Sequence, residues 1–235
     1  MDTKLTGKTR IESDLIGARE IPAEALYGVQ TLRGIENFSI SKFRLSEYPL
    51  FIKGLAITKM AAAMANFELG LLTVEQKDAI IAACGEIIDG KHHDQFPVDM
   101  IQGGAGTTTN MNANEVIANR ALELMGHERG EYQYCSPNDH VNCSQSTNDA
   151  YPTAIHIGMY FKHLQLLPHL EELIASFRKK GEEFSQIIKM GRTQLEDAVP
   201  MTLGQTFNGF ASILQDEIAH LNEAAADFLV VNMGA

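Results

Sequence analysis

The sequence is poor in cysteine and in long apolar runs. Its three cysteines, Cys84, Cys135 and Cys143, are an odd number without CxxC spacing, and the N-terminal residues MDTKLTGKTR lack the apolar segment of a secretory signal. We therefore expect reduced thiols and a cytoplasmic protein. Charged residues interrupt every apolar run before it reaches the roughly 18 residues that cross a bilayer, so we expect no membrane span.

Positive charge is also scarce. Lysine and arginine together number 19 against 30 aspartates and glutamates, which gives a net charge of −11. An acidic protein does not attract nucleic acid or an anionic membrane, although local donors can still bind a small anion. Phosphate-loop, GxSxG and zinc-ligand motifs are missing as well. His92, His93 and Asp94 are adjacent, but no further ligand follows at metal-binding spacing, so we expect no metal.

Helical periodicity dominates what is present. Residues 1–48 are mixed and predict loops, a short hairpin and a brief helix near residues 23–31. Apolar residues at intervals of three and four then predict a helix from Leu50 to Gly70. A capping-box sequence at Thr73 predicts the start of a second helix, and Gly90 predicts its end.

The second half of the chain predicts longer helices. A helix is expected at 114–125, and Ser136-Pro-Asn-Asp139 is expected to be a turn. One long helix is predicted from residue 153 to 189, and another begins near Thr202 with an apolar stripe that continues to Phe228. Two helices cannot bury each other's apolar faces completely, so further helices should pack against them.

Three polar segments interrupt this helical pattern. They are GGAGTTTNMNANEV at 103–116, SQSTND at 144–149 and GRTQLED at 191–197. Their glycines allow a ligand to approach the backbone, and their hydroxyls and amides are short hydrogen-bonding groups. We expect one site assembled from all three, with Arg192 nearby, that binds a carboxylate and stabilises developing negative charge. The plainer alternative is that the threonines at 107–109 only cap a helix.

The same segments resemble the aspartase/fumarase superfamily. GGAGTTTNMNANEVIAN, SQSTNDAYPTA and MGRTQLEDAVPMTLGQ are similar to successive signatures of that superfamily, and DLIGAREIPAEALYGVQTLRGIENF is similar to its opening. Class II fumarases carry histidine where this chain has Ser136 and Gln194. In these details the sequence resembles the aspartases more than the fumarases.

The resemblance implies a mainly α fold. Residues 1–142 would form a mixed, mostly helical N-terminal domain, and residues 143–235 would begin the long helices of a central helical bundle. Members of the superfamily are homotetramers in which three subunits build each active site. The chain reaches residue 235 without a C-terminal stop signal, so we expect the N-terminal half of a longer protein.

The resemblance also implies an activity, which is the reversible elimination of ammonia from L-aspartate to give fumarate through an enediolate, without an organic cofactor. The catalytic base of the family is a serine on a C-terminal loop that has no counterpart here, so this chain alone should be inactive. The alternatives are a class II fumarase or another lyase of the superfamily, or a non-catalytic helical assembly. The residues that would bind the dicarboxylate substrate are Thr107, Ser146, Thr147, Asn148, Thr193 and Gln194.

Overall fold

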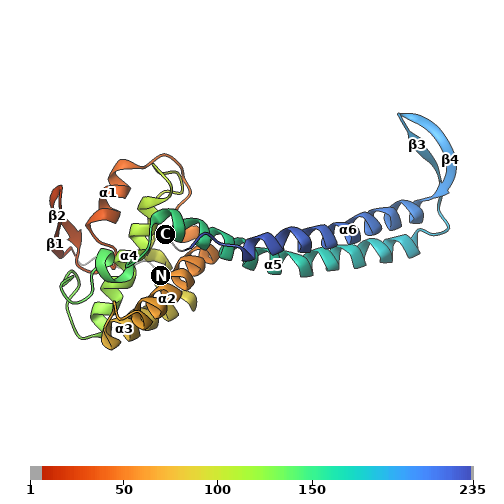
Figure 1. Cartoon of the computed structure of the whole chain (residues 1–235). Helices are drawn as coiled ribbons and strands as arrows, with labels where there is room; N and C mark the ends of the chain where they lie inside the picture. Colours follow the sequence, from red (N-terminus) through yellow and green to blue (C-terminus); the bar gives the residue numbers. More distant parts are fainter. Residues whose placement is uncertain (1–6, 234–235) are drawn as a thin grey trace. The chain divides into compact units, whose positions relative to one another are not determined.

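The computed structural model describes residues 7–233, which form two compact units (Figure 1). The division falls between Met159 and Tyr160, and the chain returns to the first unit at Val231. Both units are mainly helical, so the predicted fold class is confirmed. The division lies inside a helix, α5 (Thr147–Glu183). The domain boundary at 142 refers to the full-length protein and stays a prediction.

The first unit begins with the expected hairpin. Strand β1 (Thr9–Asp14) pairs antiparallel with β2 (Gly17–Pro22). The helix expected near residues 23–31 lies later, at α1 (Val29–Asn37). The reason is the guanidinium of Arg10, which donates to the carbonyl oxygens of four residues at distances of 2.7 to 3.3 Å and so keeps them out of a helical ladder. These residues are Pro22, Ala23, Ala25 and Tyr27.

Two buried carboxylates cap the start of α1. Glu115 accepts backbone N–H bonds from Gly28, Gln30 and Thr31 at 2.8 to 3.0 Å, and Glu12 accepts the bond from Val29 at 3.0 Å. A helix start leaves its first N–H groups without intrahelical partners, and here four successive groups are satisfied from outside. Burial raises the pKa of Glu115, which these N–H bonds oppose.

Three helices build the core of the first unit. They are α2 (Pro49–Glu68), α3 (Val74–Ile88) and α4 (Thr107–Leu124), and α2 and α3 lie side by side (Figure 1). Thr73 and Gln76 form the predicted capping box of α3. Burying each large aliphatic side chain contributes about 1.5–3 kcal/mol. Side chains that are fully buried in this core include Ile52, Leu55, Ile80, Ile87, Ile117 and Leu122.

Length and composition would allow α2 to cross a membrane, with a mean hydropathy of 1.3 over its most apolar window. Its buried side chains, Ile52, Leu55 and Ala56 among them, belong to the core that α3 and α4 complete. We therefore interpret α2 as a core helix. Among residues 7–233 no other helix has that length and composition.

The predicted helix at 114–125 begins earlier than expected, because α4 starts at Thr107. Threonine and asparagine are weak helix formers. Here side-chain hydrogen bonds hold this part of the chain in the helix. Thr109 accepts one from Gln102, and Asn110, Asn112 and Asn114 each donate one to a residue outside the helix. Residues 136–139 are also more regular than a turn, since Ser136 caps a π-helical segment, Pro137–Val141.

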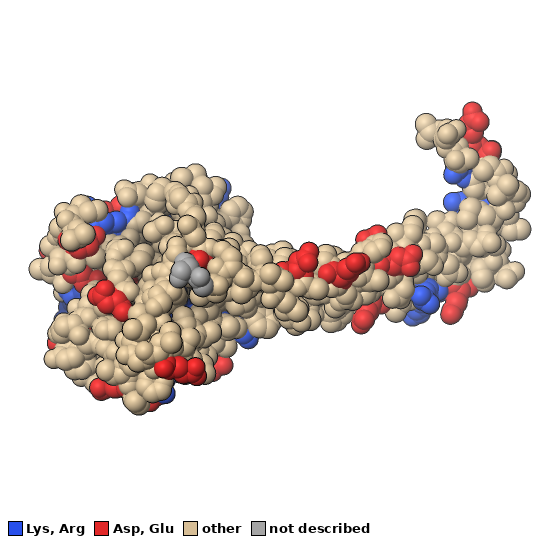
Figure 2. All heavy atoms as spheres, viewed as in Figure 1, with Lys and Arg blue, Asp and Glu red and all other residues tan. Residues whose placement is uncertain are grey.

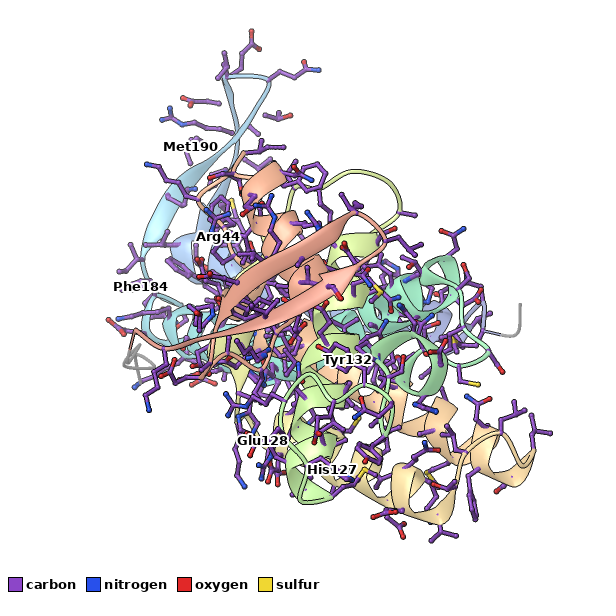
Figure 3. The ribbon with its side chains drawn as sticks, turned by 90° about the vertical axis from the view of Figure 1, so that its left-hand side faces the viewer. Arg44, His127, Glu128, Tyr132, Phe184 and Met190 are labelled. Carbon is purple, nitrogen blue, oxygen red and sulfur yellow. The ribbon has the colours of Figure 1, made fainter. Side chains whose placement is uncertain are left out.

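The second unit, Tyr160–Val230, is a helical hairpin with a strand pair at its end (Figure 1). Helix α5 ends at Glu183, so the prediction that it continues to residue 189 was wrong. Strands β3 (Ile188–Thr193) and β4 (Glu196–Thr202) pair antiparallel before α6 (Leu203–Ala226) returns along α5. Figure 3 shows Met190 on this strand pair and Phe184 at its base, where the Phe184 and Phe207 rings are 5.4 Å apart.

Apolar contacts join α5 to α6 within the second unit. Ile174, Ala211 and Ile218 are buried between them. Large apolar side chains on both helices remain exposed, among them Leu173, Phe210 and Ile213. Acidic side chains are scattered over the visible face of both units, as the net charge requires (Figure 2).

Candidate functional site

The first polar segment occupies the N-terminal end of α4. Gly106 precedes the helix with φ of +89°, a left-handed conformation that glycine adopts without strain. A Cβ atom at Gly106 would also come within 2.2 Å of the Tyr151 ring on α5. The position therefore requires glycine for two reasons, and it lets the starts of α4 and α5 approach each other closely.

The three threonines of this segment have different surroundings. Thr109 is buried and exchanges two hydrogen bonds with Gln102, at 2.9 and 2.6 Å, so its role is structural. Thr108 contacts the backbone of α1 beside Gly34, where a Cβ atom would lie 2.3 Å from its methyl group. Thr107 is exposed at the first position of the helix. Of the three, Thr107 is the one that the structure presents to solvent.

The second polar segment forms the first turn of α5. The Ser146 hydroxyl accepts the backbone N–H of Asn148 at 3.1 Å, while the Asp149 carboxylate accepts the backbone N–H of Ser146 at 2.9 Å. This reciprocal arrangement has the form of a capping box and fixes the helix start. Thr147 is partly buried and Asn148 is exposed.

A direct hydrogen bond joins these two segments. Nδ2 of Asn110 on α4 donates to Oγ1 of Thr147 on α5 at 3.1 Å. Asn110 and Asn114 also donate to Oδ1 of Asn142, at 3.0 and 3.2 Å, in the loop before α5. The structure thus brings the first and second polar segments together, as the sequence predicted.

The third polar segment lies on the strand pair of the second unit. Thr193 is the last residue of β3 and pairs with Glu196, and all of these side chains are exposed. Gln194 and Leu195 form the turn with φ values of +50° and +67°. The loop expected here is therefore a tight hairpin. That Thr193 and Gln194 share a site with the first two segments stays a prediction.

Lys59 is a functional candidate that the sequence did not identify. Its side chain on α2 is fully buried, and its ammonium donates to Asn142 Oδ1 at 2.9 Å and to Gln145 Oε1 at 3.0 Å. Burial lowers the pKa of Lys59 to about 7. The available signal was a lysine at the spacing of the apolar stripe, four residues after Leu55 and four before Ala63.

A cleft of about 730 Å³ lies in the first unit. Residues of the β1–β2 turn, α1 and the π-helical segment line it, including Arg33, Thr108, Tyr132 and Asn138. Tyr132, which lies beside α4 in Figure 3, donates to Glu12 at 2.9 Å. None of the six predicted substrate-binding residues lines this cleft, although Thr108 and Glu115 of the first polar segment do. The junction of α4 and α5, where four of those six residues lie, is therefore the candidate site.

A helical fold that places hydroxyl and amide donors at two adjoining helix starts is suited to holding a small anion. Residues 17–235 match the lyase family, and the chain belongs to it. The resemblance to the aspartase/fumarase superfamily is thereby confirmed.

Among curated proteins, the aspartate ammonia-lyase of Pseudomonas canavaninivorans is 58% identical over 226 residues, covering 96% of this chain and 48% of that protein. A crystal structure described as fumarate lyase:delta crystallin from Brucella melitensis bound to cobalt is 54% identical with a TM-score of 0.94. It covers 97% of this chain and 49% of that one. The class II fumarase of Schistosoma mansoni is 37% identical with a TM-score of 0.89, covering 97% and 48%. The chain thus spans about half the length of the relatives it matches.

Proposed function

We propose that the full-length protein containing this chain catalyses the reversible elimination of ammonia from L-aspartate to give fumarate. The observation that carries the proposal is the hydrogen bond between Asn110 and Thr147, which joins two donor-rich helix starts into one surface. The identity of 58% to an aspartate ammonia-lyase, against 37% to a class II fumarase, favours aspartate over malate as the substrate.

The donor chemistry suits this reaction. A base removes the proton from C3 of the substrate, and the electron pair moves into the adjacent carboxylate to form an enediolate. The pair then returns to form the C2–C3 double bond while the C2–N bond breaks and ammonia leaves. Uncharged donors that tighten on the carboxylate as charge develops lower the barrier selectively.

All six predicted residues would contact the substrate or line its pocket. We assign five of them to the substrate carboxylates and amino group, and Gln194 to the lining of the same pocket in the assembled protein. The five are Thr107, Ser146, Thr147, Asn148 and Thr193. The exposure of Thr107 and Asn148 at the starts of α4 and α5 supports this assignment. The reaction requires no organic cofactor.

The base would be a serine from the part of the full-length protein that follows this chain. The chain covers 48% of the aspartate ammonia-lyase it matches, which supports that division. Residues 7–233 by themselves would bind a dicarboxylate but would not catalyse its conversion.

We propose that the full-length protein is a homotetramer. Leu173, Phe210 and Ile213 are 42%, 48% and 61% exposed on the helical hairpin of the second unit, and such side chains favour burial against further helices. Light scattering of the full-length protein tests this directly. An active monomer would contradict it.

We also propose that the protein acts in the cytoplasm. Its three cysteines are free in the structure, and two of them are buried. Burial raises the pKa of Cys84 and Cys135 to about 12, which keeps both as thiols. Fractionation of cells that express the full-length protein would test this location.

The decisive experiment measures fumarate by absorbance with the full-length protein and either L-aspartate or L-malate. Release of fumarate and ammonia from L-aspartate, with little fumarate from L-malate, supports the proposal. The reverse preference would identify a fumarase, and activity on neither would favour a non-catalytic assembly.

A further inference from the structure

One amide oxygen in the first unit accepts three hydrogen bonds. Asn142 Oδ1 receives Nζ of Lys59 at 2.9 Å, Nδ2 of Asn110 at 3.0 Å and Nδ2 of Asn114 at 3.2 Å. A carbonyl oxygen has two lone pairs, so three donors saturate it. The convergence ties α2, α4 and the loop before α5 to a single atom.

The orientation of the Asn142 amide is determined by its neighbours. Its Nδ2 donates to the backbone carbonyl oxygen of Gln145 at 2.8 Å, and a carbonyl oxygen can only accept. On the other side, the charged form of Lys59 can only donate. Both constraints place Oδ1 of Asn142 toward α2 and α4.

That orientation then fixes the amide of Asn110. Facing an oxygen, Asn110 must present its NH₂ group, since two carbonyl oxygens at 3.0 Å would repel each other. The same nitrogen donates its second hydrogen to Thr147 Oγ1 at 3.1 Å. The two N–H bonds of Asn110 are therefore both used, one toward Asn142 and one toward Thr147.

The Thr147 hydroxyl oxygen consequently accepts a hydrogen bond on the side that faces Asn110. A hydroxyl carries one hydrogen and two lone pairs, and one lone pair is taken by Asn110. The single O–H hydrogen of Thr147 therefore cannot point toward Asn110 and must point elsewhere. For a residue at the start of α5 that is partly exposed, this leaves the hydrogen free to donate to a ligand.

We propose that Asn110, anchored by Asn142 and Lys59, is a positioning residue that holds the Thr147 hydroxyl as a hydrogen-bond donor to a substrate carboxylate. This inference rests on the proposed function and deepens it. Asn110 is 1% exposed and contacts no substrate in this role, since it acts through Thr147. Lys59 and Asn142 determine which face of the Asn110 amide is presented.

The test uses four variants of the full-length protein and one matched control. Asn110→Ala removes the donor, while Asn110→Asp keeps the size but offers a carboxylate that can only accept. Thr147→Ala and the double variant with Asn110→Ala complete a cycle. The control is Asn112→Ala on the same helix, where a fully buried amide donates to the carbonyl oxygen of Gln95 at 3.0 Å.

Two quantities are measured for each variant: kcat/KM for fumarate formation from L-aspartate, and the calorimetric Kd of succinate, a dicarboxylate that cannot eliminate ammonia. Asn110→Ala and Asn110→Asp should each lower kcat/KM by about tenfold or more and weaken succinate binding severalfold. Asn112→Ala should change either quantity less than about threefold. In the Thr147→Ala background, Asn110→Ala should change either quantity less than about twofold.

If Asn110→Ala lowers kcat/KM and succinate affinity equally in the unmodified protein and in the Thr147→Ala variant, the positioning role is overturned. Full activity of Asn110→Asp, or no succinate binding by the unmodified protein, would overturn it too. If the unmodified protein binds succinate but forms no fumarate from L-aspartate, the proposed reaction fails. The coupling between Asn110 and Thr147 in succinate binding then decides the positioning role by itself.

Discussion

The α4–α5 junction and the β3–β4 turn both carry predicted substrate-binding residues, yet they are held in opposite ways. At the junction, buried Asn110 donates to Asn142 at 3.0 Å and to Thr147 at 3.1 Å, and buried Lys59 donates to the same oxygen of Asn142 at 2.9 Å. At the turn, Gln194 and Leu195 are exposed and both have positive φ. The junction obtains its geometry from side-chain hydrogen bonds within its own unit, whereas the turn is held by the pairing of β3 with β4, and its side chains are exposed. Four predictions test this difference.

Glu115→Ala should have the largest effect, because it removes the acceptor that helps to hold α1 against the helix carrying the junction. Three backbone N–H groups would lose their partner, and we expect the free energy of unfolding to fall by roughly 3–5 kcal/mol. Urea unfolding measures the change. Glu115→Gln, which keeps one acceptor oxygen, should lose clearly less, and equal losses would show that the N–H bonds are not the cause.

Thr147→Ala in the full-length protein should lower turnover by about a hundredfold or more, since a donor to the developing charge is lost. Steady-state kinetics with L-aspartate measure it. Thr153→Val is a matched control on α5, because the Thr153 hydroxyl is buried and has no hydrogen-bond partner within residues 7–233. Its turnover should stay within about threefold. Unchanged kinetics of Thr147→Ala would reject the assignment.

Lys59→Met should remove a pH dependence of stability from the junction. The folded-state pKa of about 7 lies below the ordinary 10.5, so the unfolded chain binds more protons between these values. Stability should therefore rise with pH across that window, by up to about 1.4 kcal/mol per pH unit. Comparing urea unfolding near pH 7 and near pH 9 should show a smaller rise in Lys59→Met. Parallel behaviour would mean that Lys59 does not titrate there.

Leu195→Gly should have the smallest effect and the opposite sign. Two-residue hairpin turns of this kind favour glycine, and a non-glycine residue with positive φ costs about 1 kcal/mol. Leu195 is fully exposed, so no packing is lost. The urea midpoint of the full-length protein should rise slightly. A clear fall would indicate that Leu195 is buried against another subunit in the assembled protein.

Local periodicity was sufficient to predict much of the fold. The apolar spacing of α2 and the capping box of α3 at Thr73 and Gln76 are local signals, and both helices were predicted with nearly correct ends. The β3–β4 pair was missed because its turn, Gln194-Leu195, has neither glycine nor asparagine to mark it. Ile188 also continues the helical spacing of α5, although it lies in a strand.

The residue types of the candidate site were predictable from the sequence, but the hydrogen bonds that connect them were not. The hydroxyls and amides of the first two segments were recognisable from residue type, and the structure joins them through Asn110 and Thr147. The contributions of Lys59 and Asn142 depend on residues 83 positions apart in sequence meeting in space. No periodicity within a single segment carries that information.

The glycine before α4 has a consequence for altering the substrate preference of this protein. Because any side chain at Gly106 would strike the Tyr151 ring, the spacing between the two donor-bearing helix starts cannot be adjusted from that side. Variant libraries aimed at bulkier acids would be better directed at Tyr151. Replacing Tyr151 with a smaller residue leaves the left-handed backbone at Gly106 undisturbed. It also removes the contact that fixes the distance between the starts of α4 and α5.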